Sequence, residues 1–387
     1  MTSNSADRPN ARAWANVSGE AILRNYDTIQ AITGVQVMAV VKADAYGHGV
    51  NFVAPLLRAH GVTWLGVALP REALELRAAG DRGKLLCWLS TPGDPDLAAC
   101  VEADIDLSVS SSRELDEIAV AARSLGKRAN IHVKIDTGLN RNGLPTGELG
   151  QIIPELTTLA ADGVIGVRGV WSHLASADHV DPVIAHESVS AQRSVFMLAL
   201  SDLASAGIEP EVIHLANTAG ALWHPDSRFN LVRVGIGVYG LSPNVVRANS
   251  AELNLVPAMT LVARLSSVKS VAAGAGVSYL HTWISGRDSQ LGLVPVGYGD
   301  GIPRSASNRV AVSAAGELMA QVGTIAMDQF VIDTTDCAAG ISAGSEVYLF
   351  GSGEHGELTA DQWGELSGSI GYEIVTRLGS RIPRVHM

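Results

Sequence analysis

The sequence predicts an α/β fold, in which an N-terminal (β/α)8 TIM-type barrel is followed by a mostly antiparallel β-domain. Three observations predict it. The first 240 residues contain eight short apolar runs, helical patterns lie between several of them, and the texture changes after about residue 255. Runs that are apolar for most of their length are typical of strands buried on both faces of a parallel sheet. Eight such strands alternating with helices are the number that closes a barrel.

The predicted strands and helices follow one another along the chain. The strands span 37–41, 63–69, 85–90, 106–111, 130–136, 166–173, 211–217 and 231–240. Helices are predicted at 71–80, 111–128 and 186–207, where apolar residues recur among charged ones. A doubly wound open sheet is the alternative. The count of eight strands and the absence of a GxGxxG turn after any early strand favour the barrel.

The chain of 387 residues is too long for one typical core, so two domains are expected. After residue 255, short strands are separated by Gly, Ser and Asp, a texture typical of an antiparallel domain. One helix is predicted within it, at 359–368. We therefore predict a barrel over 14–252 and a C-terminal β-domain over 253–387.

Composition narrows the class of protein. Hydrophobic residues make up 47% and charged residues 17%, and the net charge of −11 disfavours nucleic acid and anionic membranes as partners. Cys87, Cys100 and Cys337 have no regular spacing, which argues against a disulfide framework or a zinc site and favours a reducing compartment. The polar start has no signal-peptide pattern, and no apolar run has transmembrane length. We expect a cytoplasmic protein without a metal.

Polar residues gather at the predicted strand ends. In a barrel of this kind, the chemistry lies at the C-terminal ends of the strands. Read in order, these ends and the eighth strand carry Lys42, Trp88, Lys134, Asp136, His173, Asn217, Thr218, Arg233 and Gly235. The sequence thus predicts a site at this end of the barrel.

Lys42 closes the apolar run of the first strand. Partial burial would lower the pKa of its amine and expose a nucleophile. Position alone favours the alternative, a lysine that extends to solvent. The turn that follows, Tyr46-Gly-His-Gly, favours a ligand, because glycines allow a close backbone approach and a tyrosine hydroxyl can donate to a phosphate.

Other candidates have ordinary alternatives as well. Arg233 lies within an apolar strand and needs an acceptor, which could be a carboxylate or a ligand atom. Asn217 and Thr218 suit a phosphate at a helix N-terminus, or a simple cap. Arg141, in a Gly-rich loop, could bind a carboxylate or be merely exposed. Tyr279 and Tyr372, taken singly, resemble any core or surface tyrosine.

Eight motifs taken together are more specific. They occur in order between residues 14 and 383 and resemble the alanine racemase family, whose members are pyridoxal-phosphate enzymes of the barrel-fold class. The motifs are AVVKADAYGHG, KIDTGLNRNG, WSHLASADH, HLANTAGAL, VRVGIGVYG, GVSYLHTW, GTIAMDQF and GYEIVTRLGSRIPR. Two positions depart from the family pattern: Asn140 replaces a frequent glycine, and Ala326 replaces a frequent cysteine.

The resemblance implies pyridoxal 5'-phosphate as cofactor. Lys42 would bind its aldehyde as a Schiff base, and Arg233 would face its pyridine nitrogen. The phosphate would be held by Tyr46, Thr218, Gly235, Ile236 and Tyr372. The complete predicted cofactor-binding set is Lys42, Tyr46, Trp88, His173, Asn217, Thr218, Arg233, Gly235, Ile236 and Tyr372.

The resemblance also implies the substrate and the reaction. Arg141 and the Met327 backbone would bind the carboxylate of alanine, and Lys134 matches a lysine that is carbamylated in some members. Tyr279, together with Met327 and Asp328, would come from the partner of a head-to-tail homodimer.

Racemisation through an external aldimine needs a base on each face. Lys42 would take the proton from D-alanine and Tyr279 from L-alanine. Tyrosine, with a reference pKa of about 10, is a weak base at neutral pH and needs cationic help. The product would be D-alanine for peptidoglycan.

Three rival functions remain at this point. Barrel-fold amino-acid decarboxylases place an acid at the pyridine nitrogen, which Arg233 argues against. Broad-specificity racemases often carry a signal peptide, and the polar start has no such pattern. Non-catalytic pyridoxal-phosphate carriers are single barrels, and residues 255–387 argue against that reading.

Overall fold

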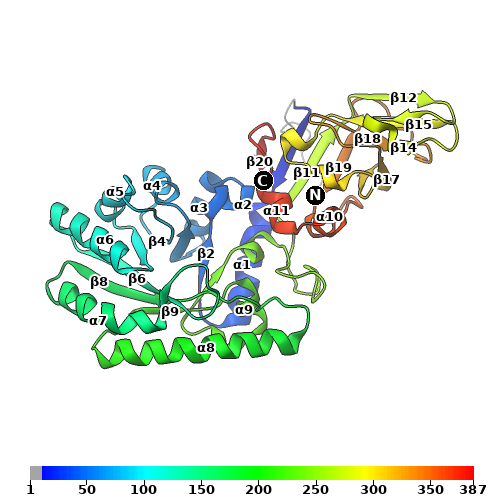
Figure 1. The fold of residues 1–387 in the computed structure, drawn as a ribbon. Coiled ribbons are helices and arrows are strands. Elements are labelled where there is room, and N and C mark those ends of the chain that lie inside the picture. Colours follow the sequence, from blue (N-terminus) through cyan, green and yellow to red (C-terminus); the bar gives the residue numbers. More distant parts are fainter. Residues whose placement is uncertain (1–10) are drawn as a thin grey trace.

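The structure, a computed structural model, describes residues 11–387 (Figure 1). Most of the polar start, in which no signal-peptide pattern is predicted, lies outside these residues. The first domain is built on eight parallel strands in the order β10–β2–β3–β4–β5–β6–β8–β9. Their bounds are β2 (Gln36–Val40), β3 (Trp64–Val67), β4 (Lys84–Cys87), β5 (Asp106–Val109), β6 (Ala129–Asp136), β8 (Ile165–Trp171), β9 (Val212–His214) and β10 (Leu231–Val234). A short strand, β7 (Leu144–Pro145), pairs with β6.

The sheet nearly closes on itself. Its two ends, β9 and β10, meet where the Arg233 backbone N–H donates to the Ala216 carbonyl at 3.0 Å. The predicted barrel is therefore confirmed, and each of the eight predicted runs overlaps one strand, which is in most cases shorter than the run. Because both faces are covered, by barrel interior and by helices, these strands read as continuous apolar runs.

Helices pack outside the barrel, and the predicted segments 71–80, 111–128 and 186–207 correspond to α4, α6 and α8. The helices of this domain are α1 (Gly19–Thr33), α3 (Val50–Ala59), α4 (Pro70–Ala78), α5 (Leu97–Glu102), α6 (Ser112–Leu125), α7 (Thr146–Ala161), α8 (Pro182–Ser205) and α9 (Thr218–Trp223). Short 3-10 turns are η2 (Pro225–Ser227) and η3 (Ile236–Tyr239). None of the described helices combines the length and apolar character that crossing a bilayer requires.

The second domain is a mostly antiparallel sheet, as predicted, in the order β12–β15–β18–β17–β16–β19–β11–β1–β20. Its strands are β1 (Ala13–Val17), β11 (Met259–Arg264), β12 (Ser267–Val271), β15 (Ser289–Val294), β16 (Ala311–Ala314), β17 (Glu317–Val322), β18 (Phe330–Asp333), β19 (Glu346–Phe350) and β20 (Arg384–His386). A separate hairpin joins β13 (Gly276–Val277) to β14 (Trp283–Ile284). Three 3-10 turns are η4 (Tyr279–His281), η5 (Tyr298–Asp300) and η6 (Arg304–Ala306).

One strand lies in a different domain from the one expected. The predicted barrel begins at residue 14, but β1 pairs antiparallel with β11 and parallel with β20, so it belongs to the second sheet. From β1 in the second domain, the chain thus enters the barrel through α1. Two helices, α10 (Ala360–Ser367) and α11 (Gly371–Thr376), lie where the domains meet, and α11 packs beside α2 (Lys42–Gly47) (Figure 1).

Candidate active site

A cavity of about 330 Å³ opens at the C-terminal ends of the barrel strands. Its walls come from the ends of most barrel strands and, across the domain boundary, from α11. It is lined by Val40, Lys42, Tyr46, Trp88, Lys134, Arg141, Trp171, His173, Asn217, Thr218, Arg233, Gly235, Ile236, Tyr372 and Thr376. The structure therefore brings the ten residues predicted to bind the cofactor into one cavity, together with Arg141 and Lys134.

Lys42 begins a single left-handed turn, α2. Residues 43–46 have φ values between 53° and 55°. This conformation costs roughly 1–2 kcal/mol per residue, so other contacts must stabilise it. The Ala43 backbone N–H donates to the Glu72 carboxylate at 2.6 Å, and the carbonyls of the turn accept from the buried His48. The turn places the Lys42 amine 5.9 Å from the ring centres of both Tyr46 and Trp88.

The surroundings of Lys42 favour its neutral form. Burial lowers the pKa of its amine, and the nearby Arg141 lowers it further. Glu72 acts in the opposite direction and Arg233 again lowers the pKa. A neutral amine is the nucleophilic form, so the cavity prepares Lys42 for covalent attachment of a carbonyl compound.

His48, which had no predicted role, supports the turn. Its Nδ1–H donates to the carbonyls of Ala45 at 3.1 Å and Tyr46 at 2.9 Å, and its ring stacks on Tyr239 with centres 4.5 Å apart. Burial lowers the pKa of His48 to about 4, so its ring is neutral at pH 7. His48 therefore orients Tyr46 without touching the cavity.

One end of the cavity suits a phosphate. A Cβ at Gly235 would lie 2.2 Å from the Tyr46 hydroxyl, so only glycine lets the backbone come this close. The Gly235 N–H donates to the Thr218 hydroxyl at 3.3 Å, and Asn217 caps α9 by accepting from the Gly220 N–H at 3.0 Å. Burial raises the pKa of the Tyr46 and Tyr372 hydroxyls. Both therefore keep their protons, and these donors match the needs of a phosphate.

Arg233 is buried in the barrel interior and also lines the cavity. Its Nη1 donates to the His214 ring at 3.0 Å, and its Nη2 donates to the Ser172 carbonyl at 2.8 Å and to the His173 ring at 3.1 Å. The guanidinium also lies 4.6 Å from the centre of the Trp171 ring. Its hydrogen-bond partners in the described chain are thus imidazoles and carbonyls, and the carboxylate that the sequence left open is not among them.

The charge state of Arg233 follows from this environment. Burial lowers its pKa to about 9, so the guanidinium remains charged at neutral pH. It can only donate hydrogen bonds. A ligand atom that meets it must be an acceptor, such as an unprotonated ring nitrogen.

Several of the groups that line the cavity are cationic. The Lys134 amine lies 4.6 Å from the centre of the Trp171 ring, and burial, Arg233 and Arg141 lower its pKa to about 8. Burial and the same arginines lower the pKa of His173 well below its ordinary value, so that imidazole is neutral. A site with this balance favours anionic ligands, including carboxylates and phosphates.

The loop that carries Arg141 is ordered by Asp136, whose carboxylate accepts from the backbone N–H groups of Gly138 at 2.9 Å and Asn140 at 3.1 Å. Asn140 has a φ of 56°, in the left-handed region that asparagine tolerates best among residues with a side chain. Asparagine can therefore adopt the left-handed conformation at this position, where the family pattern has a frequent glycine.

Three predicted residues do not line this cavity within the same chain. Tyr279, in η4, is 68% exposed, and Met327 is 52% exposed. Asp328 pairs with Arg381 at 2.7 Å. The Thr324 hydroxyl donates to the Tyr279 carbonyl at 3.0 Å, which fixes the backbone beneath the exposed phenol. The chain thus presents Tyr279 on a surface of the second domain.

Sequence reasoning missed part of the site. Val40, Trp171 and Thr376 line the cavity without having been singled out. Trp171 ends an apolar strand two residues before His173, and this position was the only indication in the sequence that it lines the site. Glu72 and His214 act through neighbouring residues, so no local pattern indicated them.

Comparison with known proteins identifies the family. The family model described as alanine racemase, N-terminal domain, matches residues 17–243, and the model for the C-terminal domain matches residues 258–386. The alanine racemase of Thermobifida fusca is 45% identical over 97% of this chain and 98% of its own. That of Beutenbergia cavernae is 47% identical over 97% and 98%.

Solved structures agree. The alanine racemase of D-cycloserine-producing Streptomyces lavendulae superposes with a TM-score of 0.94, at 44% identity over 98% of both chains. That of Bartonella henselae, solved with covalently bound pyridoxal phosphate, has a TM-score of 0.85 at 26% identity, over 97% of this chain and 100% of its own. The chain belongs to the alanine racemase family.

Proposed function

We propose that this protein interconverts L-alanine and D-alanine by moving the α-proton on opposite faces of the substrate, with Lys42 as the base on one face and Tyr279 on the other. The observation that carries the proposal is the convergence, in one cavity, of the desolvated Lys42 amine, a set of phosphate donors and the buried Arg233. The cofactor of this isomerase is pyridoxal 5'-phosphate.

The residues of the cavity fit that cofactor. Lys42 would attach it covalently, while the hydroxyls of Tyr46, Thr218 and Tyr372 and the N–H groups of Gly235 and Ile236 would hold its phosphate. Arg233 would donate to its ring nitrogen. Trp88, His173 and Asn217 complete the wall. The chemistry that pyridoxal phosphate supplies when bound is electron withdrawal from the α-carbon of the amino acid.

The protein's own groups then hold and move the proton. Lys42 takes it from D-alanine, because burial and Arg141 favour the neutral amine. Tyr279 takes it from L-alanine, and the cationic Arg141 offsets the weakness of a phenol as a base.

The carboxylate of alanine would be bound by Arg141 together with the Met327 backbone, and Asp328 belongs to the same predicted substrate-binding set. Since Tyr279, Met327 and Asp328 do not line the cavity of their own chain, we infer that a second protomer supplies them. A head-to-tail homodimer meets this requirement. Tyr279, Leu280, Met327 and Tyr298 are all exposed on the second domain, and exposed apolar groups of this kind suit an interface.

The rival functions lack support from specific contacts. A decarboxylase of this fold class needs a carboxylate at the ring nitrogen, whereas Arg233 occupies that wall. A non-catalytic carrier has no use for the second domain and its exposed Tyr279. The family's role is to supply D-alanine for peptidoglycan, and we infer the same role, in the cytoplasm, for this protein.

A racemisation assay on the purified holoenzyme tests the proposal. Alanine and then serine are offered in both directions, and exchange of the α-hydrogen with deuterated water is followed for each enantiomer. Replacing Tyr279 with Phe should slow exchange from L-alanine by roughly 10²–10⁴-fold, the usual contribution of a general base. Lys42→Ala should lose covalent attachment of the cofactor. Full activity of Tyr279→Ala with L-alanine would rule out the two-base assignment.

A further inference from the structure

A buried line of hydrogen bonds extends from Arg233 away from the cavity. Arg233 Nη1 lies 3.0 Å from His214 Nδ1, and His214 Nε2 lies 2.8 Å from His132 Nδ1. His132 Nε2 lies 3.0 Å from Asp106 Oδ2, and the other oxygen of Asp106 accepts from Arg168 at 2.7 Å. His214, His132 and Asp106 are all 0% exposed.

The line runs along the axis of the barrel. Arg233 adjoins the cavity at the C-terminal ends of the strands, whereas Asp106 is the first residue of β5. Arg168 also approaches Glu211 at 3.8 Å, just before β9 begins. Five strands therefore contribute to a polar path that connects the two ends of the barrel interior.

The hydrogen bonds along this line all donate in one direction, from Arg233 toward Asp106. Arginine has no acceptor, so His214 Nδ1 must accept the bond from Arg233. Burial and Arg233 lower the pKa of His214 well below its ordinary value, so its ring is neutral and its single proton is on Nε2. That N–H donates to His132 Nδ1, which leaves the His132 proton on Nε2, facing the Asp106 carboxylate.

We propose that Asp106 and His132 are positioning residues for Arg233. The carboxylate at the far end of the barrel fixes one donor direction through both imidazoles, so that His214 always offers an acceptor to the guanidinium and holds it toward the cofactor's ring nitrogen. With the direction reversed, an N–H of His214 would face an N–H of Arg233. The proposal rests on the function proposed above for Arg233.

Packing supports a role in orientation. Trp171 stacks on His214 with ring centres 5.6 Å apart and planes at 11°, and Trp64 meets His132 edge-on at 5.4 Å. These ring contacts favour the observed orientation of both imidazoles. Replacing buried charged groups with apolar ones often leaves stability unchanged or raises it, so stability alone gives little reason for this line.

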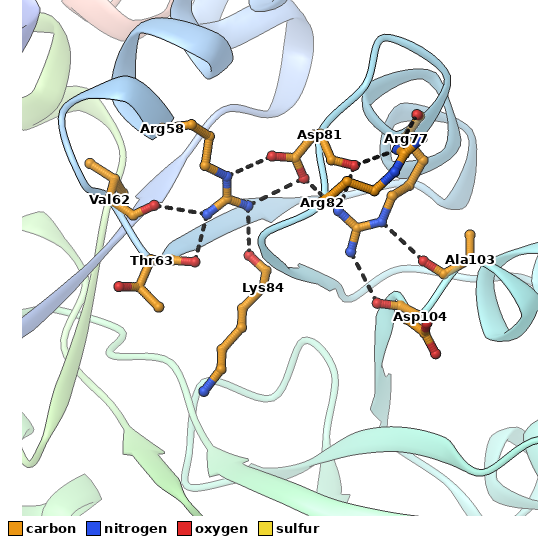
Figure 2. Close-up of polar contacts among 9 residues, drawn as sticks. All are labelled: Arg58, Val62, Thr63, Arg77, Asp81, Arg82, Lys84, Ala103 and Asp104. Atoms are coloured by element: carbon orange, nitrogen blue, oxygen red, sulfur yellow. Dashed lines mark hydrogen bonds and ion pairs between the residues drawn. The ribbon is translucent and has the colours of Figure 1, made fainter.

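A matched control lies elsewhere in the same domain. Figure 2 shows Asp81 between Arg58 and Arg77, and the Arg58 Nε donates to it at 2.6 Å. Its side chain is 6% exposed, so it too is a buried carboxylate, although its partners are two arginines rather than a histidine and an arginine. Its hydrogen-bond partners among the described residues do not include any member of the Arg233 line. Asp81→Asn therefore makes the same chemical change without touching that line.

The first measurement uses the unmodified holoenzyme. Histidine labelled with 15N reports which ring nitrogen carries the proton, and the His132 and His214 signals are assigned by their loss in His132→Phe and His214→Phe. Both rings should be neutral at pH 7 with the proton on Nε2. A proton on Nδ1 of His214, or a charged ring at either position, would overturn the proposal. Neither result depends on catalysis, so racemase activity is judged separately.

The second measurement is cofactor affinity. In Asp106→Asn the amide oxygen should stay with Arg168 and its NH₂ should turn toward His132, which reverses the line. Titrating the apoprotein with pyridoxal phosphate should give about tenfold weaker binding, equivalent to about 1.4 kcal/mol. Asp81→Asn should change it less than about twofold. Equal affinities for the two variants would contradict the proposal.

A double variant distinguishes reversal of the donor direction from general damage to the fold by Asp106→Asn. In Asp106→Asn with Arg168→Gln, the new glutamine carbonyl can accept from the amide NH₂, which frees the amide oxygen for His132. The Nε2–H forms of both histidines should return, and affinity should recover to within about threefold of the original protein, since the donor direction is restored. If neither the Nε2–H forms nor the cofactor affinity recovers, the proposal is contradicted. If Asp106→Asn fails to fold, the 15N spectrum of the unmodified protein alone tests the proposal.

Discussion

Lys42 and Lys134 are two lysines whose amines are largely withdrawn from water in the barrel. Burial is the largest cause of the lowered pKa at both, and Arg141 and Arg233 add to it. A neutral amine can attack a carbonyl carbon, at Lys42, or carbon dioxide, at Lys134. The same environment thus fits Lys42 for the proposed covalent attachment of the cofactor and makes Lys134 a candidate for carbamylation.

The burial of Lys134 should be visible as a dependence of stability on pH. Its folded-state pKa of about 8 lies below its ordinary value of 10.5, so between these pH values the unfolded chain holds a proton that the folded protein has lost. Folding therefore gains stability as pH rises through this window. In carbonate-free buffer, apo Lys134→Met should be more stable than the original protein below pH 8, and the gap should narrow toward pH 10.5.

Urea unfolding at a series of pH values measures this gap. Lys269→Met, at an exposed lysine of the second domain, is the control and should give no comparable narrowing. A gap for Lys134→Met that stays constant from pH 8 to 10.5 would contradict the proposed desolvation.

For individual residues, the sequence predicts those that line the site better than those that act on it through other residues. Lys42, Arg233 and Gly235 were found because parallel strands end at one edge and the residues there are polar or glycine. His48, Glu72 and His214 reach the site only through other residues. Their partners are set by tertiary packing, which leaves no pattern in the local sequence.

Among the elements, the left-handed turn α2 depends most on its surroundings. The segment Ala-Asp-Ala-Tyr contains no glycine, yet residues 43–46 all have positive φ. Local preference opposes this conformation, and contacts from Glu72 and His48 overcome it. The turn could not be predicted from its own residues for that reason.

The next residue, Gly47, locks the turn to α11. It has a φ of 78°, and a Cβ there would lie 2.3 Å from the Val375 carbonyl oxygen. Gly126, at the end of α6, also has a positive φ, of 60°, but nothing lies within 4 Å of its Cβ position. Comparing substitutions at Gly47 and Gly126 therefore separates the cost of backbone strain from the cost of a clash between α2 and α11.

Gly47→Ala should therefore be the more harmful change. Gly126→Ala should cost about 1 kcal/mol from backbone conformation alone. Gly47→Ala should cost about 1–3 kcal/mol more, because the packed helices must shift. It should also weaken pyridoxal-phosphate binding, since Tyr46 and Tyr372 lie on the displaced elements. Unfolding in urea and cofactor titration check both expectations, and equal effects of the two substitutions would disprove the contact.

For the whole molecule, the two domains are joined by polar as well as apolar contacts. Asp361 of α10 accepts from the backbone N–H of Ser242 at 3.2 Å and from the hydroxyl of Ser250 at 3.4 Å, both in the segment that follows the last barrel strand. Burial raises the pKa of Asp361 to about 6. The stability of this connection should therefore depend on pH in the mildly acidic range, and decline as pH rises.

The direction in which stability changes with pH follows from the pKa of Asp361. Between its unfolded value of 3.8 and about 6, the folded protein holds a proton that the unfolded chain has lost. The contribution of this group to stability is fullest below pH 3.8 and declines as pH rises through 6. Relative to Asp361→Asn, the original protein should lose stability between pH 4 and 6 and change little above. Asp162→Asn, at an exposed site, is the control, and a pH-independent difference for Asp361→Asn would contradict the assignment.

The overall architecture was largely predictable, because eight unalternating apolar runs and a later change of texture reflect burial on both faces of one sheet and on one face of the other. The position of β1 was not. Its five residues precede the first helix, and its partners β11 and β20 follow the whole barrel in sequence. Pairing between segments so distant in the chain has no local signal.

The central claim is that one site needs Lys42 of one protomer and Tyr279 of another, and mixing two inactive variants tests it most directly. Lys42→Ala and Tyr279→Phe are unfolded together, refolded as a mixture, and assayed for racemisation. If sites are shared, each mixed dimer has one site with both native bases. Random pairing then restores about a quarter of the original activity, since half the dimers are mixed and half their sites are intact. If each chain used its own Tyr279, every site would lack one base, and a mixture no more active than its separate components would contradict the account.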